Sequence, residues 1–399
     1  MPGLRKEVRV LSADAFRALD VSDEVLKALD GMGIENPTDI QKETIPVMMA
    51  GRDIIGIAPT GTGKTVAFGI PMLEYISLKE TRVQELVLAP TRELAQQIVQ
   101  ELTDLARFIP QVKIAALYGG QPMSRQINQL KHKPQIVVAT PGRTLDMVNR
   151  GHVSLAHVHT LVIDEADEML KMGFVKDVTR IIEMAPVDRQ LVMFSATTNR
   201  DVMTISWRYQ REPVEIVVEA TKENRPQIAQ HTLLIPRDKK MEALQYLLDS
   251  DEFDRVMVFV NTKFMAQRLS DKLVKEGYSA RALHGDIRQS QRTQVMNDFK
   301  RGKFPILVAT DVAARGIDVD DVEAVINYDL PNENEYYLHR IGRTGRARKH
   351  GVSFTMMTFQ ESVRMDEILR YIQSKPTPLH FDAQGILRRE DEEAFFENI

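Results

Sequence analysis

The chain has 399 residues, of which 43% are hydrophobic and 27% charged, a composition typical of a globular protein with two domains of ordinary size. It contains no cysteine, which excludes disulfides and cysteine-bound metals and favours a cytoplasmic location. The net charge of −4 argues weakly against polyanion binding, but residues 339–349 form a basic stretch without an acidic residue.

Short β-branched runs alternate with helix-like stretches along the chain. The strand-like runs lie at residues 86–91, 136–140, 161–164 and 191–195, and a second set lies at 256–260, 306–310 and 324–327. Near-continuous apolar strands with intervening helices predict parallel sheets that are covered on both faces. Two such sets predict two α/β domains.

The domain limits follow from the gaps between these sets. We place the first domain at residues 1–218, a polar linker at 219–230, the second domain at 231–375 and a C-terminal tail at 376–399. The tail carries a charged run at residues 388–393, which we interpret as part of a solvated acidic tail or a terminal helix rather than a docking motif.

Residues 58–65 read Ala-Pro-Thr-Gly-Thr-Gly-Lys-Thr and follow a strand-like run at 53–57. Glycines at such a turn let backbone N–H groups converge on phosphate oxygens at the start of a helix. Lys64 then reaches the outer phosphates and the Thr65 hydroxyl binds magnesium. The general pattern begins with glycine where this chain has Ala58, and the alternative interpretation is a chance glycine-rich turn.

Residues 162–167 read Val-Ile-Asp-Glu-Ala-Asp, an apolar strand that ends in two carboxylates. Asp164 stands where a magnesium-binding carboxylate is expected, and Glu165 can orient the water that attacks a γ-phosphate. The alternative is a pair of solvent-facing acids, but that does not explain the phosphate loop. Together the two motifs predict a nucleoside triphosphatase.

The string Asp164-Glu-Ala-Asp167 resembles the signature of the DEAD-box ATP-dependent RNA helicases of superfamily 2. The resemblance runs from about Phe16 to about Phe359, and residues 33–41 are similar to the family's Q motif. It implies a minimal core of two tandem RecA-like parallel-sheet domains joined by a short flexible linker, with ATP and Mg²⁺ as cofactors.

The resemblance also implies roles for individual residues. It assigns to the nucleotide Phe16, Thr38, Gln41, Thr60, Gly61, Thr62, Gly63, Lys64, Thr65 and Asp318. It assigns to catalysis Lys64, Asp164, Glu165, Arg343 and Arg346, and to the metal Thr65 and Asp164. It assigns to RNA Thr91, Arg92, Gly120, Thr140, Gly142, Arg143, Arg292 and Thr310. It assigns to the coupling of hydrolysis with RNA Asp167, Ser195, Thr197 and His339.

The residue types suit these implied roles. The Gln41 amide matches the N6/N7 edge of adenine, and Phe16 is expected to stack on the base, although a core aromatic is the alternative. Asp318 is expected at the ribose hydroxyls. Arg343 and Arg346, three residues apart, are expected to reach one γ-phosphate as arginine fingers, with a basic surface helix as the alternative.

Most residues assigned to RNA are Thr, Gly and Arg, which bind phosphates and sugars rather than base edges. We therefore expect a monomeric ATP-dependent RNA helicase that binds the RNA backbone without sequence specificity, on single strands or short duplexes. ATP hydrolysis would drive local unwinding or remodelling of ribonucleoprotein. Protein regulators are possible partners; a membrane is not expected, because apolar runs such as 45–50 are too short to cross one.

Three alternatives stay open. The first is an ATP-dependent RNA clamp or chaperone without productive unwinding, and the second is a DNA helicase on the same core. The third is a catalytically inactive binding scaffold, which the presence of every expected catalytic residue disfavours.

Overall fold

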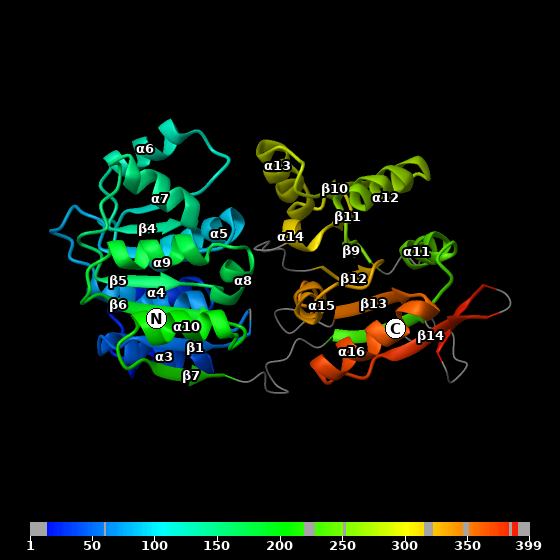
Figure 1. The fold of residues 1–399 in the computed structure, drawn as a ribbon, viewed down its shortest axis with the longest axis horizontal. Helices are drawn as coiled ribbons and strands as arrows, with labels where there is room; N and C mark the ends of the chain where they lie inside the picture. The colour runs from blue at the N-terminus through cyan, green and yellow to red at the C-terminus, as the bar shows by residue number, and fades with distance from the viewer. Residues whose placement is uncertain are drawn as a thin grey trace, which may run out of the picture. The chain divides into compact units, whose positions relative to one another are not determined.

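A computed structural model describes residues 14–59, 61–218, 228–249, 253–314, 322–345, 351–382 and 385–389. The chain divides into two compact units, residues 1–224 and 225–399, which are described separately below (Figure 1). Of the expected linker, residues 219–227 lie outside the described residues, and the first strand of unit 2 begins at Ile228, inside the range 219–230. The other predicted domain limits stay predictions.

Unit 1 is built on a sheet of seven parallel strands in the order β3-β4-β2-β5-β6-β1-β7. The strands are β1 (Ile54–Ile57), β2 (Glu85–Leu88), β3 (Ile114–Leu117), β4 (Ile136–Ala139), β5 (Thr160–Ile163), β6 (Gln190–Ser195) and β7 (Val214–Val217). The helices are α1 (Asp14–Arg17), α2 (Asp23–Gly31), α3 (Asp39–Met49), α4 (Lys64–Tyr75), α5 (Arg92–Leu105), α6 (Met123–Lys131), α7 (Pro141–Asn149), α8 (Ala166–Lys171), α9 (Val175–Met184) and α10 (Arg200–Tyr209).

The sheet of unit 1 is covered on both faces, and its strand residues divide between two apolar clusters. Val87 and Val162 pack in the cluster that contains α2, α3, α4 and α5. Leu86 and Leu161, one position earlier on the same strands, pack in the cluster that contains α7, α8, α9 and α10. Successive strand residues point to opposite faces, so an apolar run along a whole strand fits burial on both sides.

Unit 2 has eight strands in the order β10-β11-β9-β12-β13-β8-β14-β15, all parallel to their neighbours except β15. The strands are β8 (Ile228–Leu234), β9 (Val256–Phe259), β10 (Ala280–Leu283), β11 (Ile306–Ala309), β12 (Ala324–Asn327), β13 (Gly351–Met357), β14 (Thr377–Phe381) and β15 (Leu387–Arg389). The helices are α11 (Lys240–Leu248), α12 (Lys263–Lys275), α13 (Gln289–Lys300), α14 (Asp311–Ala314), α15 (Asn334–Ile341) and α16 (Ser362–Ile372), with a 3₁₀ turn η1 (Phe359–Glu361). The predicted fold class, two α/β domains with parallel-dominated sheets, is confirmed.

The segment predicted as a C-terminal tail contains the last two strands of this sheet. β14 pairs with β8, and β15 pairs with β14. Leu379 and Leu387 are buried in the core of unit 2, which compensates for the cost of ordering the segment. The expectation of a solvated tail or terminal helix is therefore wrong for residues 377–382 and 385–389. The acidic residues beyond 389 lie outside the described part of the chain.

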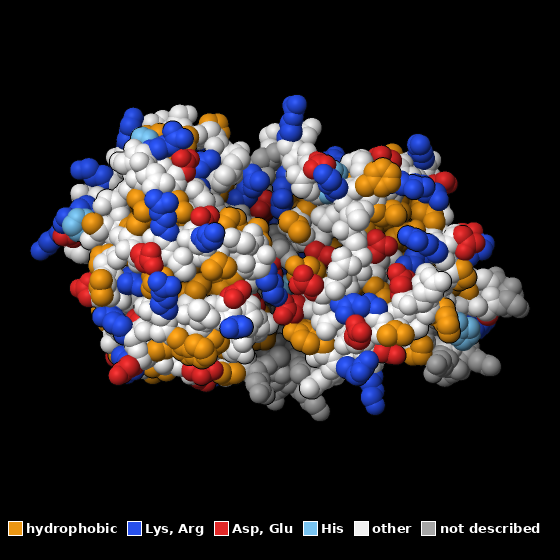
Figure 2. All heavy atoms as spheres, in the orientation of Figure 1, with side chains coloured by type: hydrophobic (Ala, Val, Ile, Leu, Met, Phe, Trp, Pro, Cys, Tyr) orange, Lys and Arg blue, Asp and Glu red, His pale blue; other side chains and the backbone are white. Residues whose placement is uncertain are grey.

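Within the described residues, no helix is both long and apolar enough to span a bilayer. Charged side chains of both signs are interspersed over the visible face of each unit (Figure 2). Because the strands of each sheet are parallel, their carboxyl ends lie at one edge, called here the carboxyl edge, and the loops that follow them meet there. Most predicted motifs follow β1, β2, β3, β4, β5 and β6 in unit 1 and β11 in unit 2. Thr38 and Gln41 instead lie at the start of α3, Arg292 lies in α13, and His339 lies in α15.

Candidate active site

The phosphate loop links β1 to α4 and is shaped by two glycines. Gly61 and Gly63 have φ angles of +85° and +87°, in the left-handed region that favours glycine. Gly63 is the N-cap of α4, and Lys64 is its first residue. The Lys64 amine is buried and donates a hydrogen bond of 3.1 Å to the Ala58 carbonyl, so the loop curls around its own lysine. Thr60 lies outside the described residues.

Thr38 and Gln41 connect the start of α3 to this loop. The Thr38 hydroxyl donates to the Thr62 carbonyl at 2.8 Å, and the Gln41 amide donates to the Gly63 carbonyl at 3.0 Å. The Gln41 carbonyl oxygen in turn accepts from the Thr38 backbone N–H at 3.0 Å, closing a capping box. A Cβ at Gly63 would lie 2.4 Å from the Gln41 amide nitrogen, so the approach requires glycine.

Gln41 is only 2% exposed, and it holds the phosphate loop, a role that the sequence-based interpretation did not include. The two contacts use one N–H and one lone pair of the amide, which has two of each. Its predicted reading of the adenine edge stays a prediction. Phe16 differs: its ring is 0% exposed in the apolar cluster of α2, α3 and α4. Because stacking needs an accessible ring face, the structure contradicts the stacking role and supports the core alternative.

The carboxylates of the second motif follow β5. Asp164 is 3% exposed, and one of its oxygens accepts the Glu165 backbone N–H at 2.9 Å. Burial raises the pKa of Asp164, while the positive charge of Lys64 and the Glu165 amide partly offset this rise. The phosphate-loop lysine and this carboxylate are therefore close enough to interact, although 100 residues separate them in the sequence.

Glu165 adopts a left-handed backbone conformation with φ of +49° and is the N-cap of α8. For a residue other than glycine this conformation costs roughly 1–2 kcal/mol, and such strain often accompanies a functional position. The turn lets α8 begin directly after the buried strand.

Three further predicted residues, Asp167, Ser195 and Thr197, are joined by hydrogen bonds. The Thr197 hydroxyl donates to the Asp167 carboxylate at 3.0 Å. Ser195, at the end of β6, donates from its hydroxyl to the Thr197 carbonyl at 2.7 Å. The structure therefore brings together three of the four residues expected to couple hydrolysis to RNA, all of them in unit 1.

The RNA-assigned residues of unit 1 lie at the same carboxyl edge. Thr91 follows β2 and caps α5, because its hydroxyl oxygen accepts the Leu94 N–H at 3.2 Å. Arg92 donates to the Gly119 carbonyl at 3.1 Å, which ties the start of α5 to the loop after β3. The next residue, Gly120, has a φ of +82°.

The third RNA-assigned segment follows β4. Thr140 is the N-cap of α7, and Gly142 and Arg143 lie in the first turn of this helix. The Arg143 side chain is largely buried and lies 4.0 Å from the Asp146 carboxylate. Three consecutive strand ends therefore present hydroxyl, backbone and guanidinium groups along one edge of the sheet.

In unit 2, the carboxyl edge is organised by Arg340, a residue to which the sequence analysis assigned no role. Its guanidinium is 1% exposed and binds both oxygens of Asp311, at 2.5 and 2.7 Å. It also donates to the Asp329 carbonyl at 2.6 Å and to the Asn261 side chain at 2.9 Å. One side chain of α15 thus joins the ends of β9, β11 and β12. Its partners are 79, 29 and 11 residues away, so no local pattern reveals it.

The predicted site residues of unit 2 lie around this centre. Thr310 is buried directly before α14, and Arg292 donates to the Ala313 carbonyl at 2.8 Å. Arg343 is half-buried and donates from Nε to the His339 carbonyl at 3.1 Å. Asp318 and Arg346 lie outside the described residues.

Comparison with known proteins gives the family. The model of the DEAD/DEAH box helicase family matches residues 38–205, and that of the helicase conserved C-terminal domain matches residues 239–348. The DEAD-box ATP-dependent RNA helicase CshA of Geobacillus kaustophilus is 45% identical over 360 residues, which cover 90% of this chain and 77% of that protein. The chain belongs to the DEAD-box ATP-dependent RNA helicases. The resemblance that the sequence motifs indicated is confirmed.

Relatives of this helicase include further curated proteins and solved structures. The ATP-dependent RNA helicase CshA of Listeria monocytogenes is 45% identical over 87% of this chain and 66% of its own length. S. cerevisiae Dbp5 bound to RNA and ADP BeF3 matches with a TM-score of 0.83 and 30% identity, covering 93% of this chain and 97% of that one. A DEAD box protein from the hyperthermophile Methanococcus jannaschii matches with a TM-score of 0.53 and 40% identity, covering 92% and 99%.

Proposed function

We propose that this helicase binds ATP at the phosphate loop of unit 1 and couples its hydrolysis to sequence-independent RNA binding and local opening of short duplexes. The observation that carries the proposal is the set of loops at the carboxyl edge of unit 1. Lys64 and Asp164 interact there, and Asp167 is bonded to Thr197. The residues assigned to RNA binding follow β2, β3 and β4 at the same edge. A structural change at the bound nucleotide can therefore reach the RNA-binding residues through neighbouring loops.

Mg²⁺ is proposed to accompany ATP, held by the Thr65 hydroxyl and the Asp164 carboxylate. Both donate hard oxygen atoms, and Mg²⁺ prefers few protein ligands, completed by phosphate oxygens and water. When bound, the ion neutralises charge on the phosphates.

Hydrolysis is assigned to residues of both units. Lys64 holds the outer phosphates, and Glu165 accepts a proton from the attacking water. Arg343 and Arg346 stabilise the charge that develops on the γ-phosphate, and Asp318 binds the ribose. The adenine base is selected at Gln41, and Thr38, Thr62 and the two loop glycines shape the cradle.

RNA is the proposed macromolecular partner. Thr91, Arg92, Gly120, Thr140, Gly142 and Arg143 of unit 1, with Arg292 and Thr310 of unit 2, supply groups that bind phosphates and sugars. His339 is proposed to pass the state of the nucleotide between the units. The capture of Dbp5 with RNA supports RNA as the partner here. The chain is proposed to act as a cytoplasmic monomer that accepts protein regulators.

The test compares RNA with DNA as activators of ATP hydrolysis. We expect RNA of mixed or uniform sequence to raise ATP turnover, and DNA of equal length to raise it far less, since 2′-hydroxyl groups distinguish the two. Affinity for RNA should rise with a non-hydrolysable ATP analogue and fall with salt. Equal affinity for RNA and DNA with and without the analogue would contradict the proposal.

A further inference from the structure

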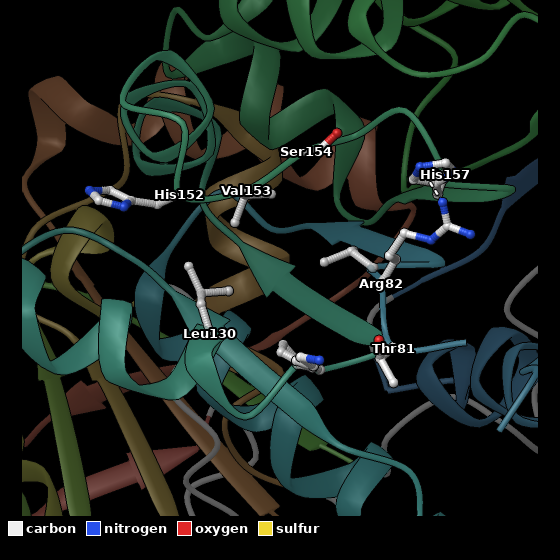
Figure 3. A pocket seen from close by; sticks show the side chains of 10 residues that line it. Thr81, Arg82, Leu130, His152, Val153, Ser154 and His157 are labelled. Carbon is white, nitrogen blue, oxygen red and sulfur yellow. Dashed lines mark hydrogen bonds between the residues drawn. The ribbon is translucent and has the colours of Figure 1, made fainter. Parts of the chain in front are cut away.

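Unit 1 has a cavity of about 250 Å³ at the amino ends of its strands (Figure 3). Its walls are the loops that lead into β2, β4 and β5, together with the end of α6. In a parallel sheet the amino ends lie at the edge opposite the carboxyl ends. The cavity is therefore separate from the phosphate loop, the carboxylates after β5 and the RNA-assigned residues of unit 1, which follow the carboxyl ends of their strands, and from Thr38 and Gln41, which contact the phosphate loop.

The floor of the cavity is apolar. Val83 and Val153 are buried, Pro134 is buried beside them, and Leu130 is half-buried. Figure 3 shows the side chains of Leu130 and Val153 directed into the same space from opposite walls. A surface of this kind favours the burial of an apolar ring, at roughly 25 cal/mol for each Å² removed from water.

The residues that line the rim are basic or protonatable, and Glu80, which pairs with Arg82 at 2.9 Å, is not among the lining residues. Arg82, Lys133, His152 and His157 all line the opening, and the Ser154 hydroxyl lies among them. All five are exposed, so their donors are accessible from solvent. An apolar floor with a small number of polar groups around it is typical of a small-molecule site.

Arg82 is held in place but keeps free donors. Its Nε and one terminal nitrogen donate to Glu80 at 3.1 and 2.9 Å, and its other terminal nitrogen donates to His157 Nε2 at 2.8 Å. A guanidinium has five N–H donors, so two remain after these three contacts. The planar group is therefore oriented in advance, and two N–H groups are left for an anion.

Lys133 occupies an unusual backbone position at the end of α6. Its φ is +56°, in the left-handed region, and its N–H donates to the Leu130 carbonyl at 2.9 Å. Glycine would fit this turn without strain, whereas a lysine costs roughly 1 kcal/mol or more. Among the described residues its amine has no ion-pair partner, so this cation stands uncompensated at the rim.

We propose that this cavity binds a small molecule that combines a phosphate group with a flat aromatic ring, the class to which nucleoside monophosphates belong. The ring covers Val83, Leu130 and Val153, and the phosphate meets Arg82 and Lys133. The volume lies just below the range of about 300–1,000 Å³ typical of ligand pockets, so it suits a ligand no larger than a single nucleotide rather than a polymer. The site is independent of the ATPase function proposed above.

Imidazole NMR signals test the proposal on the full chain. The protein has nine histidines, and His152 and His157 are assigned with the His152→Gln and His157→Gln variants. Titration with adenosine monophosphate should shift both signals saturably, and it should bind more tightly than either adenosine or inorganic phosphate. The same shifts should appear in Lys64→Ala, because the phosphate loop lies at the other edge.

Lys133→Gly removes the charge and relieves the backbone strain, so it should fold and bind adenosine monophosphate about fivefold more weakly, the upper range for an exposed ion pair. Lys27→Gln, which removes an exposed charge from α2, is the control and should bind normally. The proposal is overturned by the absence of saturable shifts, or by adenosine or phosphate binding as tightly as the monophosphate. Shifts produced by an RNA oligonucleotide and not by the monophosphate would also overturn it.

Discussion

The two units tie the loops at their carboxyl edges together in different ways. In unit 1 several side chains, such as Thr38, Gln41 and Thr197, each make hydrogen bonds that connect these loops. In unit 2 one buried guanidinium, that of Arg340, joins three strand ends. The separate hydrogen bonds of unit 1 can break one at a time when a ligand binds. The buried guanidinium of Arg340 instead holds the three loops of unit 2 together.

The same contrast separates two arginines of unit 2. Arg340 is neutralised by Asp311 and has no accessible surface for a phosphate. Arg343, three residues later, is only half-buried. We infer that Arg340 is a positioning residue and that the second unit's contribution to hydrolysis comes from Arg343, together with Arg346. The following variants test this division, in order of expected effect.

Arg343→Ala should lower the rate of ATP hydrolysis by about 10³–10⁵, the usual contribution of an arginine finger. Affinity for ATP should change little, because the phosphate loop of unit 1 supplies most of the binding. Single-turnover hydrolysis and equilibrium binding of ATP measure the two effects. Arg370→Gln, at an exposed position of α16, is the control. A loss of less than tenfold in Arg343→Ala would show that Arg343 is a surface residue without a role in hydrolysis.

Arg340→Met should destabilise unit 2 by about 3–5 kcal/mol, because it leaves the Asp311 carboxylate without its buried partner. Hydrogen exchange of the β9, β11 and β12 amides measures the loss locally. Arg340→Lys should recover only part of it, since an ammonium group lacks the planar fork that binds both oxygens. Unchanged exchange in Arg340→Met would show that the edge is held by other contacts.

Gln41→Ala should weaken nucleotide binding by about 1–3 kcal/mol, the value of two hydrogen bonds. If Gln41 supports the phosphate loop, GTP affinity must fall along with that for ATP, because both nucleotides use the same loop. Parallel binding titrations with ATP and GTP measure this, and Lys42→Gln on the same helix is the control. A loss for ATP with GTP untouched would confine Gln41 to the adenine base.

Much of the fold and of the candidate site was predictable from the sequence, and some was not. The apolar runs predicted the strands, and Gly61, Gly63 and Lys64 predicted the loop after β1, because these signals are local. Phe16 was assigned to adenine, but its burial depends on packing between helices that no short pattern encodes. Arg340 and the strand pairing of residues 377–389 depend on partners far away in the sequence, so only the folded chain identifies them.

The most direct test of the central claim, that ATP hydrolysis controls RNA binding, is the lifetime of the RNA complex in Glu165→Gln. This variant keeps Asp164 and Lys64 but loses the base, so hydrolysis should fall by about 10²–10⁴ while ATP still binds. With ATP present, labelled single-stranded RNA should dissociate much more slowly than from the unaltered chain, and Glu24→Gln should behave normally. Hydrolysis near the normal rate, or an RNA lifetime that does not change, would contradict the account.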